Sequence, residues 1–163
     1  MLIIVEGSDG LGKTTLAKSL QSTMRSAYVH YGPLPAWWRK DLYLTALSHA
    51  VYDRYYWSTW AYSLVYKQPV IMTASECVEL DAFHRAQCAN AFLSVVLYAS
   101  EDSFFDDRAE DPLFKAEQIK AVNDRYREYK HAFDVAIDVC KGYPQYEWNP
   151  LCDAAPKFST AQA

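Results

Sequence analysis

The sequence predicts an α/β fold in which helices cover both faces of a parallel sheet of five strands. Two observations predict it. Short apolar runs alternate with longer stretches of helical spacing along the chain, and this alternation is typical of βαβ units. The first apolar run also leads directly into a glycine-rich loop and a helix. Ligands of such folds bind at the carboxyl ends of the strands, where this loop would lie.

The expected strands are apolar runs that end in turn-forming or charged residues. The run Leu2 to Val5 precedes the glycine-rich loop, and a turn signal, Gly-Pro-Leu-Pro, follows the second run. The run at 92–98 is of the kind that lies buried between two helical layers. We expect strands at 2–5, 27–31, 49–53 and 92–98, and a short final strand at 146–148.

The expected helices lie between these runs. Thr73 and Glu76 have the spacing of a capping box, in which two side chains satisfy each other's backbone at a helix start. An acidic loop is expected at 102–112. We expect helices at 13–24, 39–47 and 55–66, a long one after Thr73, and one at 113–140 from the spacing of Ile119, Val122, Tyr126 and Phe133.

Length and charge restrict the domain count and the partners. The 163 residues suffice for one domain, expected at 1–155 with a flexible tail at 156–163. The net charge of −4 and the pI of about 5.5 leave no broad basic face for a nucleic-acid polymer, so a small free nucleotide is the better partner. The sequence shows no signal peptide and no long apolar run, so we expect a cytoplasmic protein with no membrane partner.

The segment from Gly7 to Thr14 has the P-loop pattern G-x-x-x-x-G-K-T. Its glycines permit the turns that point backbone N–H groups at a phosphate, Lys13 can reach the terminal phosphates, and the Thr14 hydroxyl can contact Mg²⁺. The positive end of the next helix faces the same anions. The predicted ATP phosphate-binding residues are Gly7, Asp9, Gly10, Leu11, Gly12, Lys13, Thr14 and Thr15.

A second group of polar residues, Asp53 and Arg54, follows the third expected strand. An acidic residue at this place in a P-loop protein can orient Mg²⁺ or its waters, so Asp53 joins Thr14 as a predicted metal-binding residue. The planar fork of Arg54 suits capture of a phosphate. The histidines and cysteines, by contrast, show no metal-ligand spacing, and we expect reduced thiols and satisfied or surface histidines.

The segments VEGSDGLGKTT and DRYYWSTWAYS together resemble the thymidylate kinases, and the later VNDRYREY segment matches the same family at Val122 and Tyr126. The resemblance implies a three-layer P-loop kinase fold with a five-stranded parallel sheet flanked by helices. It also implies a nucleoside monophosphate kinase, which moves the γ-phosphoryl group of ATP to the 5′-phosphate of a deoxynucleotide, with dTMP as the preferred acceptor. The family further suggests a homodimer.

The resemblance also assigns roles to individual residues. By it, Lys13 and Thr14 hold ATP and Mg²⁺, Asp9 lies near the sugar and phosphate of the acceptor, and Arg54 binds the acceptor phosphate. The predicted catalytic residues are Lys13, Arg54, Arg108 and Asp9. The predicted acceptor-binding residues are Asp9, Arg54, Tyr62, Trp38 and Arg39.

The acceptor region is shorter than in the family. The compact form, with HYGP after the second strand, is similar to thymidylate-kinase-like proteins of bacteriophages, for which the location would be the host cytoplasm. In place of the missing helix stand Trp37, Trp38, Arg39 and Lys40, which either stack on a base and contact a phosphate or pack a loop against the core.

The lid of the family supplies a catalytic arginine when the P-loop does not. Here the P-loop position is Gly10, and Arg108 is the single arginine of the acidic segment 101–111. Arg108 therefore either neutralises charge on the transferred group or balances charge within a solvated loop.

Two other functions stay open. A deoxynucleoside kinase would need a general base for the sugar hydroxyl, and Glu6, just before the P-loop, is the candidate. A non-catalytic nucleotide-binding module would bind ATP without an acceptor. The acceptors dTMP and thymidine distinguish the three, because the module would phosphorylate neither.

Overall fold

The computed structural model describes residues 1–32, 40–66, 72–89, 91–108 and 115–141. The strands of these residues form one parallel sheet in the order β2-β3-β1-β4-β5. β1 is the central strand, so the loop that follows it lies beside the ends of β3 and β4. The strands are β1 (Leu2–Gly7), β2 (Ala27–His30), β3 (Ala50–Asp53), β4 (Phe92–Tyr98) and β5 (Val135–Asp138).

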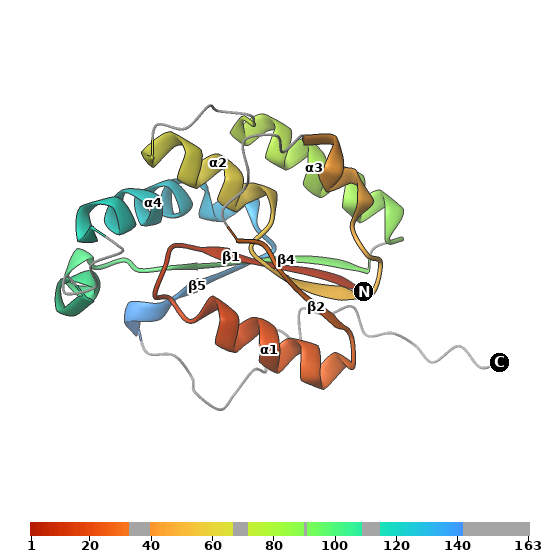
Figure 1. The fold of residues 1–163 in the computed structure, drawn as a ribbon, viewed down its shortest axis with the longest axis horizontal. Coiled ribbons are helices and arrows are strands. Elements are labelled where there is room, and N and C mark those ends of the chain that lie inside the picture. The colour runs from red at the N-terminus through yellow and green to blue at the C-terminus, as the bar shows by residue number, and fades with distance from the viewer. Residues whose placement is uncertain (33–39, 67–71, 90, 109–114, 142–163) are drawn as a thin grey trace.

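Helices cover both faces of the sheet, which confirms the predicted three-layer α/β fold (Figure 1). One face carries α1 (Lys13–Met24), and the other carries α2 (Tyr56–Val65), α3 (Ala74–Gln87) and α4 (Ala116–Tyr129). No helix in the described part of the chain is long and apolar enough to cross a membrane. Short 3₁₀ helices complete the structure: η1 (Lys40–Thr45), η2 (Asp102–Arg108), η3 (Lys130–Ala132) and η4 (Val139–Lys141).

The central strand β1 is buried on both sides, as its continuous apolar run predicts. Leu2 and Ile4 belong to the core under α2, α3 and α4, whereas Ile3 and Val5 belong to the core under α1. Alternate side chains of a strand point to opposite faces, so one apolar run contributes to both cores. This fixes the position from which the P-loop starts.

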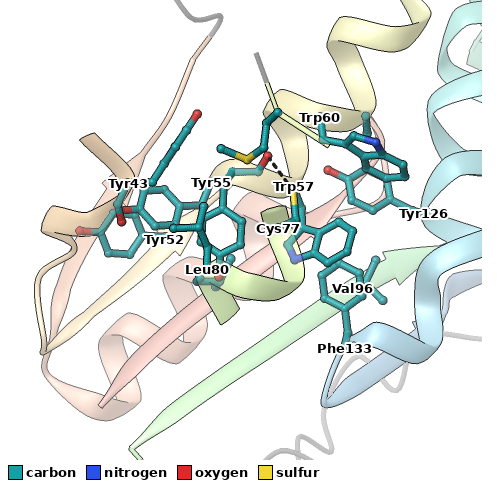
Figure 2. Close-up of a cluster of buried hydrophobic side chains, with 14 of the residues drawn as sticks. Tyr43, Tyr52, Tyr55, Trp57, Trp60, Cys77, Leu80, Val96, Tyr126 and Phe133 are labelled. Carbon is teal, nitrogen blue, oxygen red and sulfur yellow. Dashed lines mark hydrogen bonds between the residues drawn. The ribbon is translucent and has the colours of Figure 1, made fainter. Parts of the chain in front are cut away.

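The larger core is strongly aromatic, and much of the tyrosine and tryptophan content lies there (Figure 2). The ring of Trp57 lies 4.9 Å from that of Phe133, and Trp60 meets Tyr129 edge to face at 4.8 Å between centroids. Tilted and edge-to-face contacts of this kind are favourable for aromatic pairs. These two contacts therefore stabilise the packing of α2 against the end of α4 and the turn that follows it.

The expected helix at 113–140 is wrong in its second half. α4 ends at Tyr129, and the chain turns through η3 into β5. Asp134 fixes this turn, because its carboxylate accepts hydrogen bonds from the Ser94 backbone at 2.8 Å and from Arg85 at 2.9 Å. The run Val-Ala-Ile then pairs with β4 as the fifth strand. The final strand expected at 146–148 lies outside the described residues.

Several other local expectations can be compared with the structure. Thr73 and Glu76 form the predicted capping box at the start of α3. The short helix expected at 39–47 is the 3₁₀ helix η1, and the acidic loop expected at 102–112 contains the 3₁₀ helix η2. Where β4 ends, the Asn123 amide accepts from the Ala99 N–H and donates to its carbonyl, both at 2.9 Å. These contacts fix α4 to the strand that leads into η2.

Candidate functional site

The P-loop has the backbone conformation that its glycines were expected to permit. Gly7, Gly10 and Gly12 have φ values of 138°, 79° and 84°, in a region that side chains disfavour. A Cβ atom at Gly7 would also collide with the carbonyl oxygen of Leu97 on β4. Gly12 is the residue from which α1 starts, so the positive end of this helix faces the loop.

Lys13 turns back over the P-loop. Its Nζ donates to the Ser8 carbonyl at 2.5 Å and lies 4.0 Å from Oδ1 of Asp9. The side chain is 5% exposed. Burial lowers the pKa of Lys13 to about 8, against the opposing attraction of Asp53 and Glu6. An anion bound in the loop would attract this ammonium group and favour its charged form.

Asp53 ends β3 and is completely buried. Its Oδ2 accepts three hydrogen bonds, from Thr14 Oγ1 at 2.6 Å, Tyr28 OH at 2.8 Å and His30 Nδ1 at 3.1 Å. Its Oδ1 is also buried and has no hydrogen-bond partner among the described residues. A hard cation prefers hydroxyl and carboxylate oxygens. The residues Thr14 and Asp53 therefore fit Mg²⁺ or its waters.

Arg54 follows in a left-handed conformation with φ 70°, unusual for a residue with a side chain. Its backbone N–H donates to Val5 at 3.0 Å, which places the residue beside the P-loop strand. The guanidinium group pairs with Oδ1 of Asp9 and lies 5.0 Å from the ring centroid of Tyr62. Its Nε and the Tyr62 hydroxyl are buried without hydrogen-bond partners among the described residues. Buried polar atoms normally have a partner, and a ligand that reached this pair would supply one.

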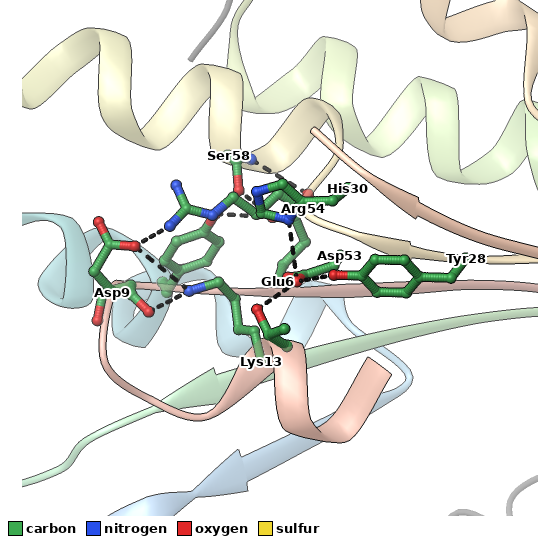
Figure 3. Close-up of polar contacts among 11 residues, drawn as sticks. Glu6, Asp9, Lys13, Tyr28, His30, Asp53, Arg54 and Ser58 are labelled. Atoms are coloured by element: carbon green, nitrogen blue, oxygen red, sulfur yellow. Dashed lines mark hydrogen bonds and ion pairs between the residues drawn. The ribbon is translucent and has the colours of Figure 1, made fainter. Parts of the chain in front are cut away.

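Two cations from different elements thus meet at one carboxylate oxygen (Figure 3). Lys13 starts α1 and Arg54 follows β3. Both side chains approach Oδ1 of Asp9, which belongs to the P-loop. A pair of phosphate-sized anions bound by the two cations would therefore be neighbours. That arrangement suits transfer between two phosphates, because such catalysis consists largely of positioning and charge neutralisation.

Glu6 is fully buried, and its carboxylate holds α2 rather than facing solvent. Oε1 accepts from the backbone N–H of Tyr55 at 2.8 Å and of Ser58 at 3.3 Å. Oε2 accepts from Ser58 Oγ at 2.5 Å and from Tyr126 OH at 3.1 Å. Burial raises the pKa of Glu6, although these hydrogen bonds oppose the shift. Four donors and no exposure make the carboxylate a structural cap for the first turn of α2.

The structure brings six of the predicted site residues together: Asp9, Lys13, Thr14, Asp53, Arg54 and Tyr62. Gly10, Gly12 and Thr15 are exposed around them, whereas the Leu11 side chain is buried in the core and leaves only its backbone for a phosphate. Trp38 and Arg39 lie outside the described residues, as does the side chain of Arg108 at the end of η2.

Tyr28 and His30 were not among the predicted site residues, yet both contact Asp53. They occupy alternate positions of β2, and His30 lies opposite Asp53 in the parallel register. A tyrosine and a histidine two residues apart at the end of a strand share one face of the sheet. That spacing is the signal in the sequence that could have indicated them.

No known family model matches the chain, and no curated protein matches it in sequence. Among solved structures, it is similar to the YorR protein from Bacillus subtilis in complex with phosphorylated GDP, with a TM-score of 0.65 and 21% identity over 85% of each chain. The chain has a P-loop kinase fold. A second similar structure is deoxyadenosine kinase from M. mycoides with bound dATP, with a TM-score of 0.45 and 18% identity over 85% of this chain and 91% of that one.

Proposed function

We propose that the protein is a nucleoside monophosphate kinase that transfers the γ-phosphoryl group of ATP to the 5′-phosphate of a deoxynucleotide. The observation that carries this proposal is the meeting of Lys13 and Arg54 at Asp9. Lys13 belongs to the ATP-binding loop, and the fork of Arg54 suits the phosphate of an acceptor. Their common neighbour makes the two phosphate sites adjacent, as direct transfer requires.

The P-loop binds the donor in this proposal. The backbone N–H groups between Gly7 and Thr15 surround the ATP phosphates, with the Lys13 ammonium over them. Thr14 and Asp53 would hold Mg²⁺, which when bound neutralises charge on the phosphates. Asp9 keeps Lys13 and Arg54 beside each other while both hold anions.

The acceptor site contains Arg54, Asp9 and the ring of Tyr62. We propose dTMP as the preferred acceptor, because the segment DRYYWSTWAYS resembles the thymidylate kinases. We also expect measurable turnover with dUMP and other deoxynucleotides. Stacking on an aromatic ring holds any base, and few polar groups would be left unpaired by a wrong one. Trp38 and Arg39 remain proposed contributors to this site.

The geometry of Glu6 argues against the deoxynucleoside kinase. A general base must reach the hydroxyl proton that it removes, whereas the carboxylate of Glu6 is fully buried and accepts four hydrogen bonds. A monophosphate acceptor needs no such base, because its phosphate oxygen is already ionised. The monophosphate kinase therefore uses the groups that the site presents.

A panel of acceptors with ATP and Mg²⁺ tests the proposal. We expect the fastest turnover on dTMP and none on thymidine, with Lys13→Ala as the inactive control. A purine monophosphate that reacts ~100-fold faster, equal to about 2.7 kcal/mol, would replace the thymidylate preference and keep the monophosphate kinase. Transfer to thymidine alone would establish the deoxynucleoside kinase. ATP binding without transfer to either acceptor would establish the binding module.

A further inference from the structure

The carboxylate of Asp53 has two oxygens with opposite surroundings. Thr14, Tyr28 and His30 all donate to Oδ2, at 2.6, 2.8 and 3.1 Å. Oδ1 has no partner among the described residues, although it is buried. Buried carboxylate oxygens normally have a hydrogen bond or a cation. The three donors therefore fix the orientation of the carboxylate and leave one oxygen for a ligand.

We propose that Tyr28 and His30 are positioning residues for Mg²⁺, which hold Asp53 in the orientation that receives the ion bound with ATP. The inference rests on the proposed function, in which Thr14 and Asp53 are the metal-binding residues. Both new residues come from β2, which the P-loop and Asp53 motifs do not include. Partners that orient a metal-binding carboxylate commonly change metal affinity by about 10- to 100-fold when they are removed.

The strand register explains how β2 reaches the site. His30 lies opposite Asp53 in the parallel pair β2–β3, and Tyr28 lies two residues earlier on the same face. The longer tyrosine side chain lets its hydroxyl reach the same oxygen (Figure 3). Because an ionised carboxylate only accepts hydrogen bonds, the Nδ1 atom of His30 carries a proton toward Asp53.

If Tyr28 and His30 only stabilised the fold, their replacement would lower the free energy of unfolding and would not act on the response to Mg²⁺ alone. The side chain of His30 is 46% exposed on an edge strand, so its removal should cost little folding free energy. The hydroxyl of Tyr28 could also be removed while its ring stays in place. A change confined to the response to Mg²⁺ would thus come from the orientation of Asp53 and not from loss of the fold.

The test is calorimetric titration of ATP into the full chain, in EDTA and at a series of Mg²⁺ concentrations. We expect Mg²⁺ to tighten ATP binding to the wild-type protein. In Tyr28→Phe and in His30→Leu, the Mg²⁺ concentration that gives half of this effect should rise about tenfold or more. The affinity for ATP in EDTA should stay within about twofold, because the contacts of the P-loop are unchanged.

Three further variants sharpen the test. His30→Asn should restore the Mg²⁺ response to within about threefold, because its amide can place a donor near the position of Nδ1. Tyr129→Phe and His49→Leu are matched controls, since Tyr129 contacts Trp60 in the aromatic core and His49 lies near the amino group of Met1. Both should titrate like the wild type.

Three results would overturn the inference: an unchanged Mg²⁺ response in both variants, an equal loss of ATP affinity in EDTA, or a wild-type protein whose ATP binding ignores Mg²⁺. Failure of the proposed function gives a separate result, because it is measured by transfer to a monophosphate. A protein that binds ATP with Mg²⁺ through Asp53 and transfers nothing would support this inference and contradict the kinase.

Discussion

Oε2 of Glu6 lies 2.5 Å from Oγ of Ser58, and this contact joins the end of the P-loop strand to the first turn of α2. The same carboxylate also accepts from the backbone of Tyr55, the residue after Arg54. Glu6 therefore fixes the P-loop strand and the segment that follows Arg54 relative to each other. The relationship gives this buried carboxylate a function in geometry and not in proton transfer.

Replacement of Glu6 tests that role. Glu6→Gln should keep transfer to dTMP within about tenfold, because an amide can still accept from the backbone and the hydroxyls of Ser58 and Tyr126 can rotate. Glu6→Ala leaves buried donors unpaired and should lower the free energy of unfolding by about 3 kcal/mol. Denaturant unfolding and initial rates measure the two effects. If Glu6→Gln is inactive although it folds stably, Glu6 acts as a general base and the geometric role is wrong.

Lys13→Ala should reduce turnover by about a thousandfold while the fold persists, because in the proposed reaction the ammonium contacts charge that moves during transfer. The exposed Lys115→Ala is a matched control with wild-type rates expected. Wild-type turnover by Lys13→Ala would contradict the proposal that the protein is a kinase.

The protonation of Lys13 predicts a pH dependence of ATP binding. Burial lowers the pKa of Lys13 to about 8, so the free protein loses this positive charge as the pH rises past 8 and its affinity for ATP should fall. In Lys13→Arg the cation stays charged, and this fall should disappear. Titrations of ATP at pH 7 and 9 provide the comparison, and an identical fall in both proteins would assign it to another group.

Arg54→Ala should raise the KM for the acceptor about 10- to 100-fold, with ATP affinity within about twofold, because in the proposed function its fork binds the acceptor phosphate and not ATP. Arg54→Gly is the matched variant, since glycine adopts the positive φ of this position without strain. It should be more stable than Arg54→Ala by about 1 kcal/mol and equally poor at binding the acceptor. Equal weakening of ATP and acceptor would assign Arg54 to a different role.

Arg108→Ala should lower kcat at least about tenfold with nearly unchanged ATP affinity, as expected for a contact made mainly in the transition state. Arg125→Ala is the matched control, because Arg125 is exposed on α4 and pairs with Glu128 at 3.4 Å. If kcat of Arg108→Ala stays within about threefold, a barrier change below ~1 kcal/mol, the lid assignment is wrong.

Asp81 predicts how stability depends on pH. Its buried carboxylate accepts from the Tyr56 hydroxyl and from Trp57 Nε1, and burial raises its pKa to about 7. The folded protein then holds a proton that the unfolded chain has lost, so the free energy of unfolding should fall as pH rises from 4 to 7. The slope is at most about 1.4 kcal/mol per pH unit for one group.

Asp81→Asn should remove this part of the slope and become the more stable protein at neutral pH. Urea unfolding at pH 4 to 8 measures the difference between the two proteins. If the free energies of unfolding of the two proteins run parallel with pH, Asp81 titrates alike in the folded and unfolded states. A shallow slope in the same direction should remain in Asp81→Asn, because burial also raises the pKa of Glu6.

The P-loop and the first four strands could be predicted because their signals are local. Glycine at positions 7 and 12 and the apolar run before them determine the loop from adjacent residues. The fifth strand could not be predicted in the same way. Val135 and Ile137 continue an apparently helical stretch, and it is Asp134, through contacts with Ser94 and Arg85, that turns the chain toward the sheet.

The candidate site likewise contains residues that a local motif predicts and contacts that depend on distant parts of the chain. Lys13 and Thr14 follow from the motif, whereas the partners of Glu6 lie 49, 52 and 120 residues away in the chain. Asp53 could be predicted from its place at a strand end, but its contact with His30 depends on the pairing of β2 with β3. Long-range pairing of this kind leaves only a weak trace in a single sequence.

Gly7 also limits how the P-loop could vary. The strand below the P-loop touches the Leu97 carbonyl so closely that no side chain fits between them. At this point β1 and β4 meet through main chain alone, so substitution cannot fill or widen the space between them. If the loop binds a nucleotide as proposed, differences in nucleotide choice have to come from side chains on the segments around the loop, while this backbone contact stays common to every variant that folds.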